Sequence, residues 1–227
     1  MTPCAAKVTV SFPELVKEFS KGKAEHVGTP IRPLLFQGDR SRAYTALNLD
    51  PSLPTVVGLG GGTGSLFINN LIISSLPELL NFCQVIHITG AGKSVPAIAL
   101  KEKQEHYHAF EFVVNELPNI FAAADIVICR AGIGTLTELS ALGKPAVVIP
   151  IPDSQQELNV EYFKHYKAII SLSQRELSAQ SFIEEIRELI GDRESLKFLH
   201  TQIQKLSFPN SRERMRDIIL EYGQDNK

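Results

Sequence analysis

A cluster of glycines is the strongest candidate for chemistry in this sequence. Residues 53–65 read LPTVVGLGGGTGS, and a helical pattern begins at Leu66. The glycines of the turn are Gly58, Gly60, Gly61, Gly62 and Gly64. A strand that ends in such a turn and opens a helix presents unpaired backbone N–H groups and a positive helix dipole, and glycine lets a phosphate approach closely. The pattern predicts a diphosphate-binding loop; the alternative is a tight strand–helix turn without a ligand.

Two common phosphate motifs do not fit. In G-x-G-x-x-G the third glycine would fall on Thr63 or Ser65. The acid expected about 20 residues on is also absent, since the second strand ends His87-Ile88-Thr89-Gly90. Gly92-Lys93-Ser94 looks like the end of a P-loop, but the opening glycine would have to stand where His87 does. These failures disfavour a dehydrogenase and a P-loop nucleotidase.

A second glycine-containing turn follows the apolar run 125–129. It holds Gly132, with Thr135 and Thr137 in the first helical turn and Glu138 one turn in. Its amides can accept a second phosphate, and a carboxylate at this place can accept two ribose hydroxyls. The alternative for Glu138 is charge complementarity with the helix N-terminus.

Three amides open a further helical pattern. Gln155, Gln156 and Asn159 stand at i, i+1 and i+4, so that Gln156 and Asn159 share a face. Amide side chains both donate and accept, which suits sugar hydroxyls. Each alone could equally be a solvated helix start.

The sequence contains no paired-Asp motif for a metal, so we expect no metal and no cofactor. A diphosphate would then depend on amides, helix dipoles and basic side chains. Arg32 and Arg130 are the candidates, although Arg130 could equally form a structural salt bridge. We interpret His106 and His108 as surface residues.

The elements that must position these residues alternate regularly from residue 54. We expect strands at 55–59, 84–89, 109–114, 125–129, 145–150 and 168–171. We expect helices at 64–76, 95–105, 117–123, 132–142, 155–165, 178–190, 193–206 and 210–222, with an earlier strand at 7–10. Alternation predicts an α/β fold, a Rossmann-like parallel sheet with helices on both faces, whose ligands lie at the carboxyl ends of the strands.

Composition narrows the class of protein. The chain has 227 residues, 44% hydrophobic and 21% charged, with a net charge of −2 that argues against nucleic-acid coating. Cys4, Cys83 and Cys129 show no pairing pattern, and no signal core or membrane-spanning run is visible. We therefore expect a soluble, cytoplasmic protein.

The ordered set of motifs resembles the C-terminal, donor-binding domain of glycosyltransferase family 28. The motifs are the glycine loop, His-x-Thr-Gly at 87–90, ADIVICRAG at 124–132, Thr-x-x-Glu at 135–138, Gly-Lys-Pro-Ala at 143–146 and Gln-x-x-Asn at 156–159. The resemblance runs from about Val8 to the end. It implies the C-terminal half of a GT-B fold, and an enzyme that transfers N-acetylglucosamine from UDP to a peptidoglycan lipid intermediate.

The resemblance also implies roles for individual residues. The loop that meets the donor diphosphate matches Gly61, Gly62, Thr63 and Gly64, with Arg32 as a basic residue beside it. Backbone that reads uracil matches Val113 and Val114, and Glu138 matches the ribose acid. The turn beneath the phosphates matches Ile133, Gly134, Thr135, Leu136 and Thr137. The N-acetylglucosamine amides match Gln155, Gln156 and Asn159. Gly62-Thr63 stands where the family usually has Ser-Gln, Ala131 where a Ser is common, and 150–153 is short and lacks the family's basic residues.

The family's N-terminal domain, with its acceptor site and general base, has no counterpart in these residues. The expected divisions are therefore an interdomain remnant and linker at 1–53, a UDP-sugar-binding domain at 54–207 and a C-terminal helix at 208–227. We expect a missing N-terminal domain or a partner subunit to supply acceptor and base, and the chain to be inactive without it. We expect the inner membrane face to be reached through that partner. The alternative is a non-catalytic nucleotide-sugar-binding module or truncated relic.

Overall fold

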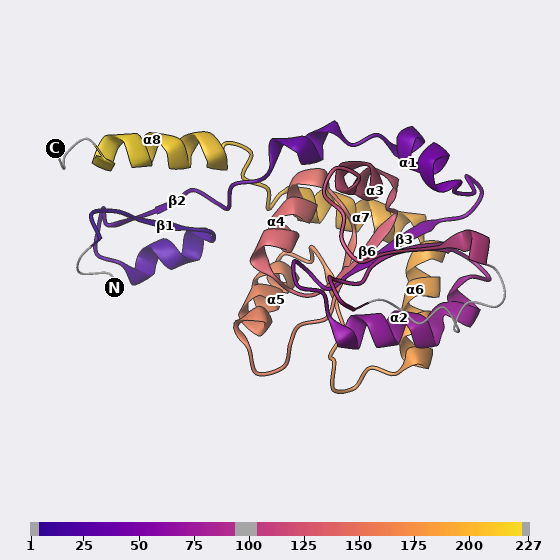
Figure 1. Ribbon diagram of the computed structural model, residues 1–227. Coiled ribbons are helices and arrows are strands. Elements are labelled where there is room, and N and C mark those ends of the chain that lie inside the picture. Colours follow the sequence, from indigo (N-terminus) through magenta and orange to yellow (C-terminus); the bar gives the residue numbers. More distant parts are fainter. Residues whose placement is uncertain (1–4, 94–103, 224–227) are drawn as a thin grey trace.

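A six-stranded parallel sheet forms the centre of the protein (Figure 1). The computed structural model describes residues 5–93 and 104–223. The strands are β3 (Thr55–Leu59), β4 (Gln84–Ile88), β5 (Tyr107–Phe110), β6 (Ile126–Cys129), β7 (Ala146–Val148) and β8 (Ile170–Ser171). Their order is β5-β4-β3-β6-β7-β8, with every neighbouring pair parallel. The predicted α/β class is confirmed.

The strands β3, β4, β6 and β7 are fully buried and mostly apolar, because helices cover both faces of the sheet. Alternate residues point to opposite faces: Val56 belongs to the core cluster on one face and Val57 to the cluster on the other. The same alternation holds for Val147 and Val148.

Helices cover each face. They are α1 (Arg40–Leu47), α2 (Leu66–Leu79), α3 (Leu117–Ala123), α4 (Ile133–Leu142), α5 (Gln155–His165), α6 (Ala179–Gly191) and α7 (Arg193–Gln204). Buried residues of α2 and α6 join one core cluster, and those of α1, α3, α4 and α5 join the other. Helix α7 contacts α4 and α6 and contributes to both clusters through Ile203 and Leu199.

The strand order reverses direction between β3 and β6. From β3 the chain adds β4 and β5 on one side, then returns to β6 and continues outward through β7 and β8. Such a reversal opens a crevice at the carboxyl ends of the two central strands. The two glycine turns predicted to bind phosphate, after β3 and after β6, both lie there.

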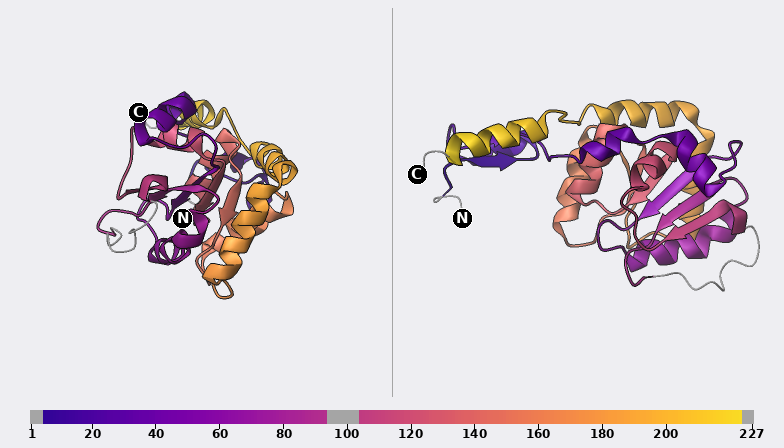
Figure 2. Two further views of the ribbon diagram at one scale, coloured as in Figure 1. Left: turned by 90° about the vertical axis from the view of Figure 1, so that its right-hand side faces the viewer. Right: turned by 45° about the horizontal axis from the view of Figure 1, so that its top comes forward.

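A small lobe stands beside the main domain (Figures 1 and 2). It contains the parallel pair β1 (Val8–Val10) and β2 (Ala24–His26), the connecting 3-10 helix η2 (Pro13–Glu18), and α8 (Ser211–Gly223). Arg214 of α8 pairs with Glu25, and Phe208 packs edge-on against His26 at 4.7 Å. Segments from the two ends of the sequence therefore form one unit.

The segment predicted as a linker is instead structured. Residues 33–53 contain the 3-10 helix η3 (Pro33–Gln37) and α1, and Leu35, Ala43 and Leu49 are buried in the main core. The polar residues that suggested a linker include Asp39, whose side chain accepts hydrogen bonds from the first N–H groups of α1.

Two further expectations need correction. The strand predicted at 109–114 lies two residues earlier and is shorter, because its pairing with β4 begins at Tyr107. His106 and His108 are half-buried rather than at the surface, and burial lowers the pKa of His108. The helix predicted at 95–105 falls almost entirely outside the described residues, apart from a 3-10 turn, η5, at Gln104–His106.

Within residues 5–93 and 104–223, no helix is long and apolar enough to cross a membrane. Cys83 and Cys129 are buried free thiols, and burial raises the pKa of each to about 12.

Candidate nucleotide-sugar site

The glycines after β3 divide into two groups by their surroundings. A Cβ on Gly60 would lie 2.0 Å from the Ser65 nitrogen, and one on Gly64, whose φ is +71°, would lie 2.2 Å from the Thr89 carbonyl oxygen. These two are required by packing. By contrast, a Cβ on Gly61 or Gly62 would meet nothing within 4 Å. Their backbone is therefore the part of the loop that a ligand can approach.

A buried hydrogen-bond network supports the loop against which the glycines pack. Asn69 donates through Nδ2 to the Thr89 carbonyl (3.0 Å), so its Oδ1 accepts from His87 Nε2 (3.0 Å). His87 Nδ1 then accepts from the Tyr107 hydroxyl (2.9 Å). Burial lowers the pKa of His87 to about 4, so the imidazole is neutral at pH 7. His87 is thus a structural residue of β4.

Arg130, which follows β6, bonds to the loops after β3 and β7 and does not pair with an acidic residue. It is 8% exposed, and its Nε donates to the Ser65 hydroxyl that caps α2 (3.0 Å). Its Nη1 donates to the carbonyls of Ile149 and Pro150, each at 3.1 Å. No acidic residue in the described part of the chain pairs with it, so the salt-bridge interpretation is wrong. Burial without a counter-ion lowers its pKa.

Lys93 lies against the glycine loop. In the sequence it stood out only as part of Gly92-Lys93-Ser94, which resembles the end of a P-loop but lacks the opening glycine. Its Nζ donates to the carbonyls of Thr63 (2.5 Å) and Gly64 (3.1 Å). These contacts bring a positive charge to the loop predicted to meet a diphosphate. Neither the spacing nor the motif pointed to it, because the contact joins residues about 30 apart.

Glu138 and Arg32 form an ion pair at the mouth of a cavity. Arg32 donates to Glu138 Oε1 from Nε (3.1 Å) and Nη2 (3.0 Å), and the carboxylate side chain is 19% exposed against 53% for Arg32. The cavity has a volume of about 140 Å³. Its lining brings Arg32 and Glu138 together with Gly61, Gly62, Val113 and Thr135.

The wall opposite Glu138 comes from the segment after β5. Val113 is buried, whereas Val114 and Phe112 are 45% and 65% exposed. Phe112 lines the cavity, and Glu111, also in the lining, accepts from the Gly92 N–H at 3.0 Å. Val114 is not part of the lining. Sequence reasoning missed Phe112, because it placed a strand through this segment.

The start of α4 faces the same crevice through its backbone. Gly132 is the N-cap and no side chain caps the helix, so its first N–H groups remain for a ligand. Leu136 points into the core, and Thr137 bonds back to the carbonyls of Ile133 and Gly134. Of these side chains, only that of Thr135 lines the cavity.

Two of the three predicted amides on α5 hold the loop after β6. Gln156 Oε1 accepts from the N–H groups of Ala131 (3.2 Å) and Ile151 (3.1 Å), while Asn159 Nδ2 donates to the Ala131 carbonyl (2.9 Å). Gln156 Nε2 and Asn159 Oδ1 are the polar atoms of this pair outside those bonds. Gln155 is exposed.

In the described residues no group of three His, Cys, Asp or Glu is arranged to hold a metal ion. The site therefore combines the open backbone of two glycine turns, a carboxylate and two amides at one edge of the sheet. Three cations, Arg32, Lys93 and Arg130, lie close to the glycine turns. This combination suits a ligand with phosphates at one end and hydroxyls at the other.

Solved structures that superpose on this chain include glycosyltransferases of the GT-B class. A crystal structure of Acinetobacter baumannii MurG superposes with a TM-score of 0.69 at 18% identity, over 96% of this chain and 60% of that one. The calicheamicin glycosyltransferase CalG4 gives a TM-score of 0.67 at 16% identity, over 98% of this chain and 55% of that one. The fold is thus that of the C-terminal half of a GT-B glycosyltransferase.

The chain belongs to the family described as glycosyltransferase family 28 C-terminal domain, whose model matches residues 55–215. It is 35% identical over 225 residues to the Clostridium tetani UDP-N-acetylglucosamine–N-acetylmuramyl-(pentapeptide) pyrophosphoryl-undecaprenol N-acetylglucosamine transferase, covering 97% of this chain and 61% of that protein. The enzyme of the same name from Lachnoclostridium phytofermentans is 36% identical over 197 residues, 85% of this chain and 55% of that protein. The chain thus spans about 60% of the length of these relatives, and the predicted family resemblance is confirmed.

Proposed function

We propose that this chain binds UDP-N-acetylglucosamine and forms the donor half of a transferase acting on a lipid-linked acceptor. One observation carries the proposal: the Glu138 carboxylate and the open backbone of Gly61 and Gly62 line one cavity at the crevice between β3 and β6. In this arrangement the carboxylate accepts hydrogen bonds from the ribose hydroxyls, and the backbone N–H groups of the loop donate hydrogen bonds to the diphosphate. Phe112 and Val113 then enclose the base, which prefers an aromatic or apolar surface.

The chemical role of this half is to stabilise a leaving group. A hydroxyl of the acceptor attacks the anomeric carbon with inversion, the bond to the phosphate oxygen breaks, and negative charge grows on UDP. Backbone N–H groups at the starts of α2 and α4 face that charge without reorganising, and Lys93 and Arg130 add positive charge nearby. The general base and the acceptor site are proposed to belong to an N-terminal partner.

Calorimetric titration of the chain with UDP-N-acetylglucosamine, UDP-glucose, UDP and NAD, without metal, tests the donor site. We expect the uridine ligands to bind, the N-acetyl sugar to bind best, and NAD not to bind. Glu138→Ala should weaken UDP binding about tenfold or more, since it removes the acceptor of two hydroxyl hydrogen bonds. Glu157→Ala, which removes an exposed carboxylate of α5, is the matched control.

Failure of every uridine ligand to bind a folded chain would contradict a working donor site in this chain. Binding of UDP without preference for the N-acetyl sugar would instead favour a general nucleotide-sugar module.

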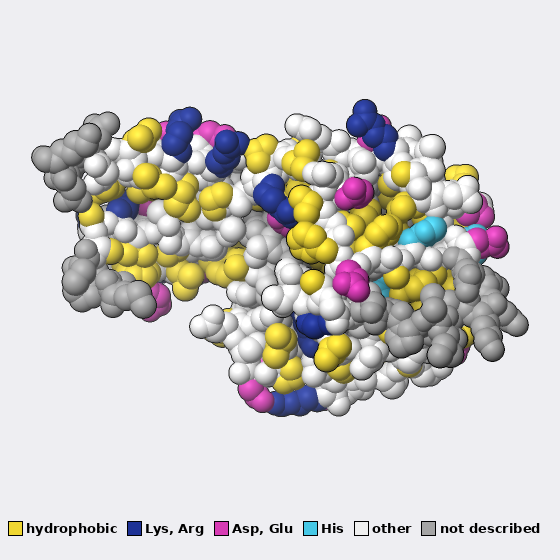
Figure 3. All heavy atoms as spheres, viewed as in Figure 1, with side chains coloured by type: hydrophobic (Ala, Val, Ile, Leu, Met, Phe, Trp, Pro, Cys, Tyr) yellow, Lys and Arg dark blue, Asp and Glu magenta, His cyan; other side chains and the backbone are white. Residues whose placement is uncertain are grey.

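The small lobe is the proposed attachment point of the partner. In the parallel pair, the Val8 N–H donates to Lys23 and the Val10 carbonyl accepts from Val27. Because parallel strands use alternate residues for each neighbour, the backbone groups of Thr9 point to the outer edge of β1. Figure 3 shows hydrophobic side chains along the lobe, whose exposed apolar residues include Ile219. Two strands make a marginal sheet, so a third strand alongside β1 would complete it.

A further inference from the structure

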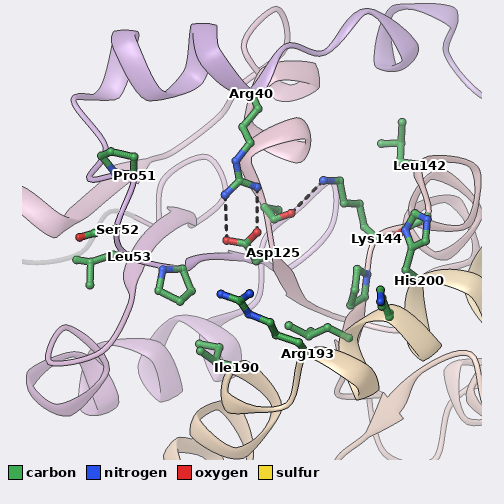
Figure 4. Close-up of a pocket in the computed structure, with 16 residues that line it drawn as sticks. Arg40, Pro51, Ser52, Leu53, Asp125, Leu142, Lys144, Ile190, Arg193 and His200 are labelled. Atoms are coloured by element: carbon green, nitrogen blue, oxygen red, sulfur yellow. Dashed lines mark hydrogen bonds and ion pairs between the residues drawn. The ribbon is translucent and has the colours of Figure 1, made fainter.

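A second, larger cavity lies at the opposite edge of the sheet (Figure 4). Its volume is about 560 Å³, within the range of small-molecule pockets. Leu53 and Pro54 before β3, Asp125 before β6 and Pro145 before β7 all line it. The cavity is therefore separated from the candidate donor site by the length of the strands.

Basic side chains dominate this cavity. Those that line it are Arg40 of α1, Lys144 before β7, and Arg193, Lys197 and His200 of α7. The residues of α7 stand at i, i+4 and i+7 and so share one face of the helix. Asp125 is the only carboxylate in the described lining, in a protein whose net charge is −2.

Asp125 is already fully used within the fold. Its two oxygens accept from Arg40 Nη1 (2.9 Å) and Nη2 (3.3 Å), and Oδ2 also accepts from the Thr55 N–H (2.8 Å). Figure 4 shows this two-pronged contact at the upper wall of the cavity. The carboxylate therefore neutralises Arg40 and leaves the other cations without an acidic partner in the wall.

Two of the other basic groups have structural roles that do not neutralise them. Lys144 donates to the carbonyls of Ala122 (3.1 Å) and Ala124 (3.0 Å) at the end of α3, and burial lowers its pKa to about 8. His200 Nδ1 donates to the Gly143 carbonyl at the end of α4. These bonds fix the positions of the two side chains and do not neutralise the ammonium charge of Lys144.

Arg193 and Lys197 do not have such a role. Arg193 makes no ion pair with any described residue, and Lys197 meets only Glu194, at 3.4 Å, in a pair whose side chains are both about 80% exposed. Exposed pairs of this kind contribute little. In Figure 4 the guanidinium of Arg193 extends towards the middle of the cavity.

From this convergence we infer that the cavity between α1, α7 and the start of β7 binds a phosphate-bearing anion. Arg193 supplies the planar fork that pairs with two phosphate oxygens. Lys197 and Lys144 supply further charge from two sides. The site is independent of the donor site, because the two share no lining residue.

Titration with inorganic pyrophosphate tests the inference. The double variant Arg193→Ala/Lys197→Ala removes two exposed side chains and so should fold normally. The matched control, Lys17→Ala/Arg212→Ala, removes one exposed lysine and one exposed arginine from the lobe and changes the net charge equally. We expect the first variant to lose at least tenfold in pyrophosphate affinity and the control to change less than twofold.

The inference is overturned by three results: no binding by the wild-type chain at millimolar pyrophosphate, an unchanged affinity in the α7 variant, or an equal loss in both variants. Pyrophosphate bound at the glycine loop contributes equally to both charge-matched variants, so a difference between them reports on the α7 cavity. Uridine titration reports on the donor site separately, so failure of one proposal is distinguishable from failure of the other.

The source of the phosphate is identified by a parallel co-sedimentation experiment. Vesicles of phosphatidylglycerol and of phosphatidylcholine are compared for wild type and the α7 variant. Recruitment by the anionic vesicles alone, lost in the variant, assigns the site to a lipid head group. Pyrophosphate binding without such recruitment assigns it to a soluble phosphorylated molecule.

Discussion

The glycines of the loop after β3 are glycines for different physical reasons. Gly64 is fixed by its positive φ and by the Thr89 carbonyl, whereas Gly62 has open space around its Cα. Both appear as glycine in the sequence and in the same motif. Packing explains the first, and we expect access for a ligand to explain the second.

Alanine substitutions should separate these two roles. Gly64→Ala is expected to destabilise the fold by about 1–3 kcal/mol through backbone strain alone, with a further steric cost. Gly62→Ala should change stability by less than about 0.5 kcal/mol yet weaken UDP binding several-fold, because the methyl group occupies the approach of the phosphate. Urea unfolding and calorimetry measure the two effects. An equal loss of stability in both variants would show that the loop is only a structural turn.

His87 makes the fold sensitive to acid. Its pKa is near 4 in the folded protein and near 6.5 in an unfolded chain, so the unfolded state takes up the proton first. Its contribution is therefore complete above about pH 6.5 and is lost as the pH falls towards 4. The full effect is about 3 kcal/mol. We expect the stability of wild type to fall between pH 7 and 4.5 more steeply than that of His87→Gln. Parallel slopes would contradict a buried neutral imidazole.

Among the elements, α5 joins two parts of the site. Near its start, Gln156 accepts from the Ala131 and Ile151 N–H groups, and so connects the ends of β6 and β7. The neighbouring Gln155 is exposed. If the start of α5 only faced solvent, both glutamines would be exposed, whereas Gln156 accepts two backbone hydrogen bonds and Gln155 is exposed.

Alanine substitutions at the two glutamines test the role of α5. Gln156→Ala leaves two backbone N–H groups without their acceptor, which costs about 1–3 kcal/mol, and should reduce the preference for UDP-N-acetylglucosamine over UDP. Gln155→Ala should leave stability unchanged. Thermal unfolding and titration with both ligands provide the measurements; a stronger effect from Gln155 would reverse the assignment.

The strands and helices could be predicted from the sequence more accurately than the contacts between them. Mostly apolar runs predicted β3, β4, β6 and β7, because a strand buried on both faces carries few polar positions to obscure the pattern. Segment 33–53 was misread because Leu35 and Ala43 become buried only through tertiary packing. Similarly, Lys93 reaches the glycine loop by folding, and no local pattern encodes that contact.

At the scale of the whole molecule, the lobe is the part with the smallest sheet and, among the described residues, an unpaired strand edge. Its sheet has two strands, and its outer edge at Thr9 carries backbone groups directed away from β2. The main domain, by contrast, buries both faces of β3, β4, β6 and β7. This difference leads us to expect that the lobe meets another chain.

Proline at the lobe edge tests that expectation. Thr9→Pro removes the outward N–H of β1 without removing a bond to β2. We expect the chain to self-associate or to retain a partner when captured from its source cells, and Thr9→Pro to reduce that association at least fivefold. The matched control is Thr9→Val, which changes the same side chain but keeps the backbone N–H. A proline elsewhere, such as Thr201→Pro in α7, would disrupt a helix and is not a suitable control. A monomeric chain with no partner in either assay would contradict the expectation, as would N-acetylglucosamine transfer by the chain alone.

The junction between the lobe and the main domain has a mechanical consequence. Phe12 of the lobe stacks at 4.1 Å on Tyr162, and Glu14 accepts from the Tyr166 hydroxyl (3.0 Å), so the lobe contacts the end of α5. The other end of the same 11-residue helix, about 16 Å away, bears Gln156. A helix this short is stiff and behaves as a lever. We therefore expect that a tilt of the lobe, imposed by an associated subunit, would move Gln156 and Asn159 and change the affinity of the chain for the proposed donor.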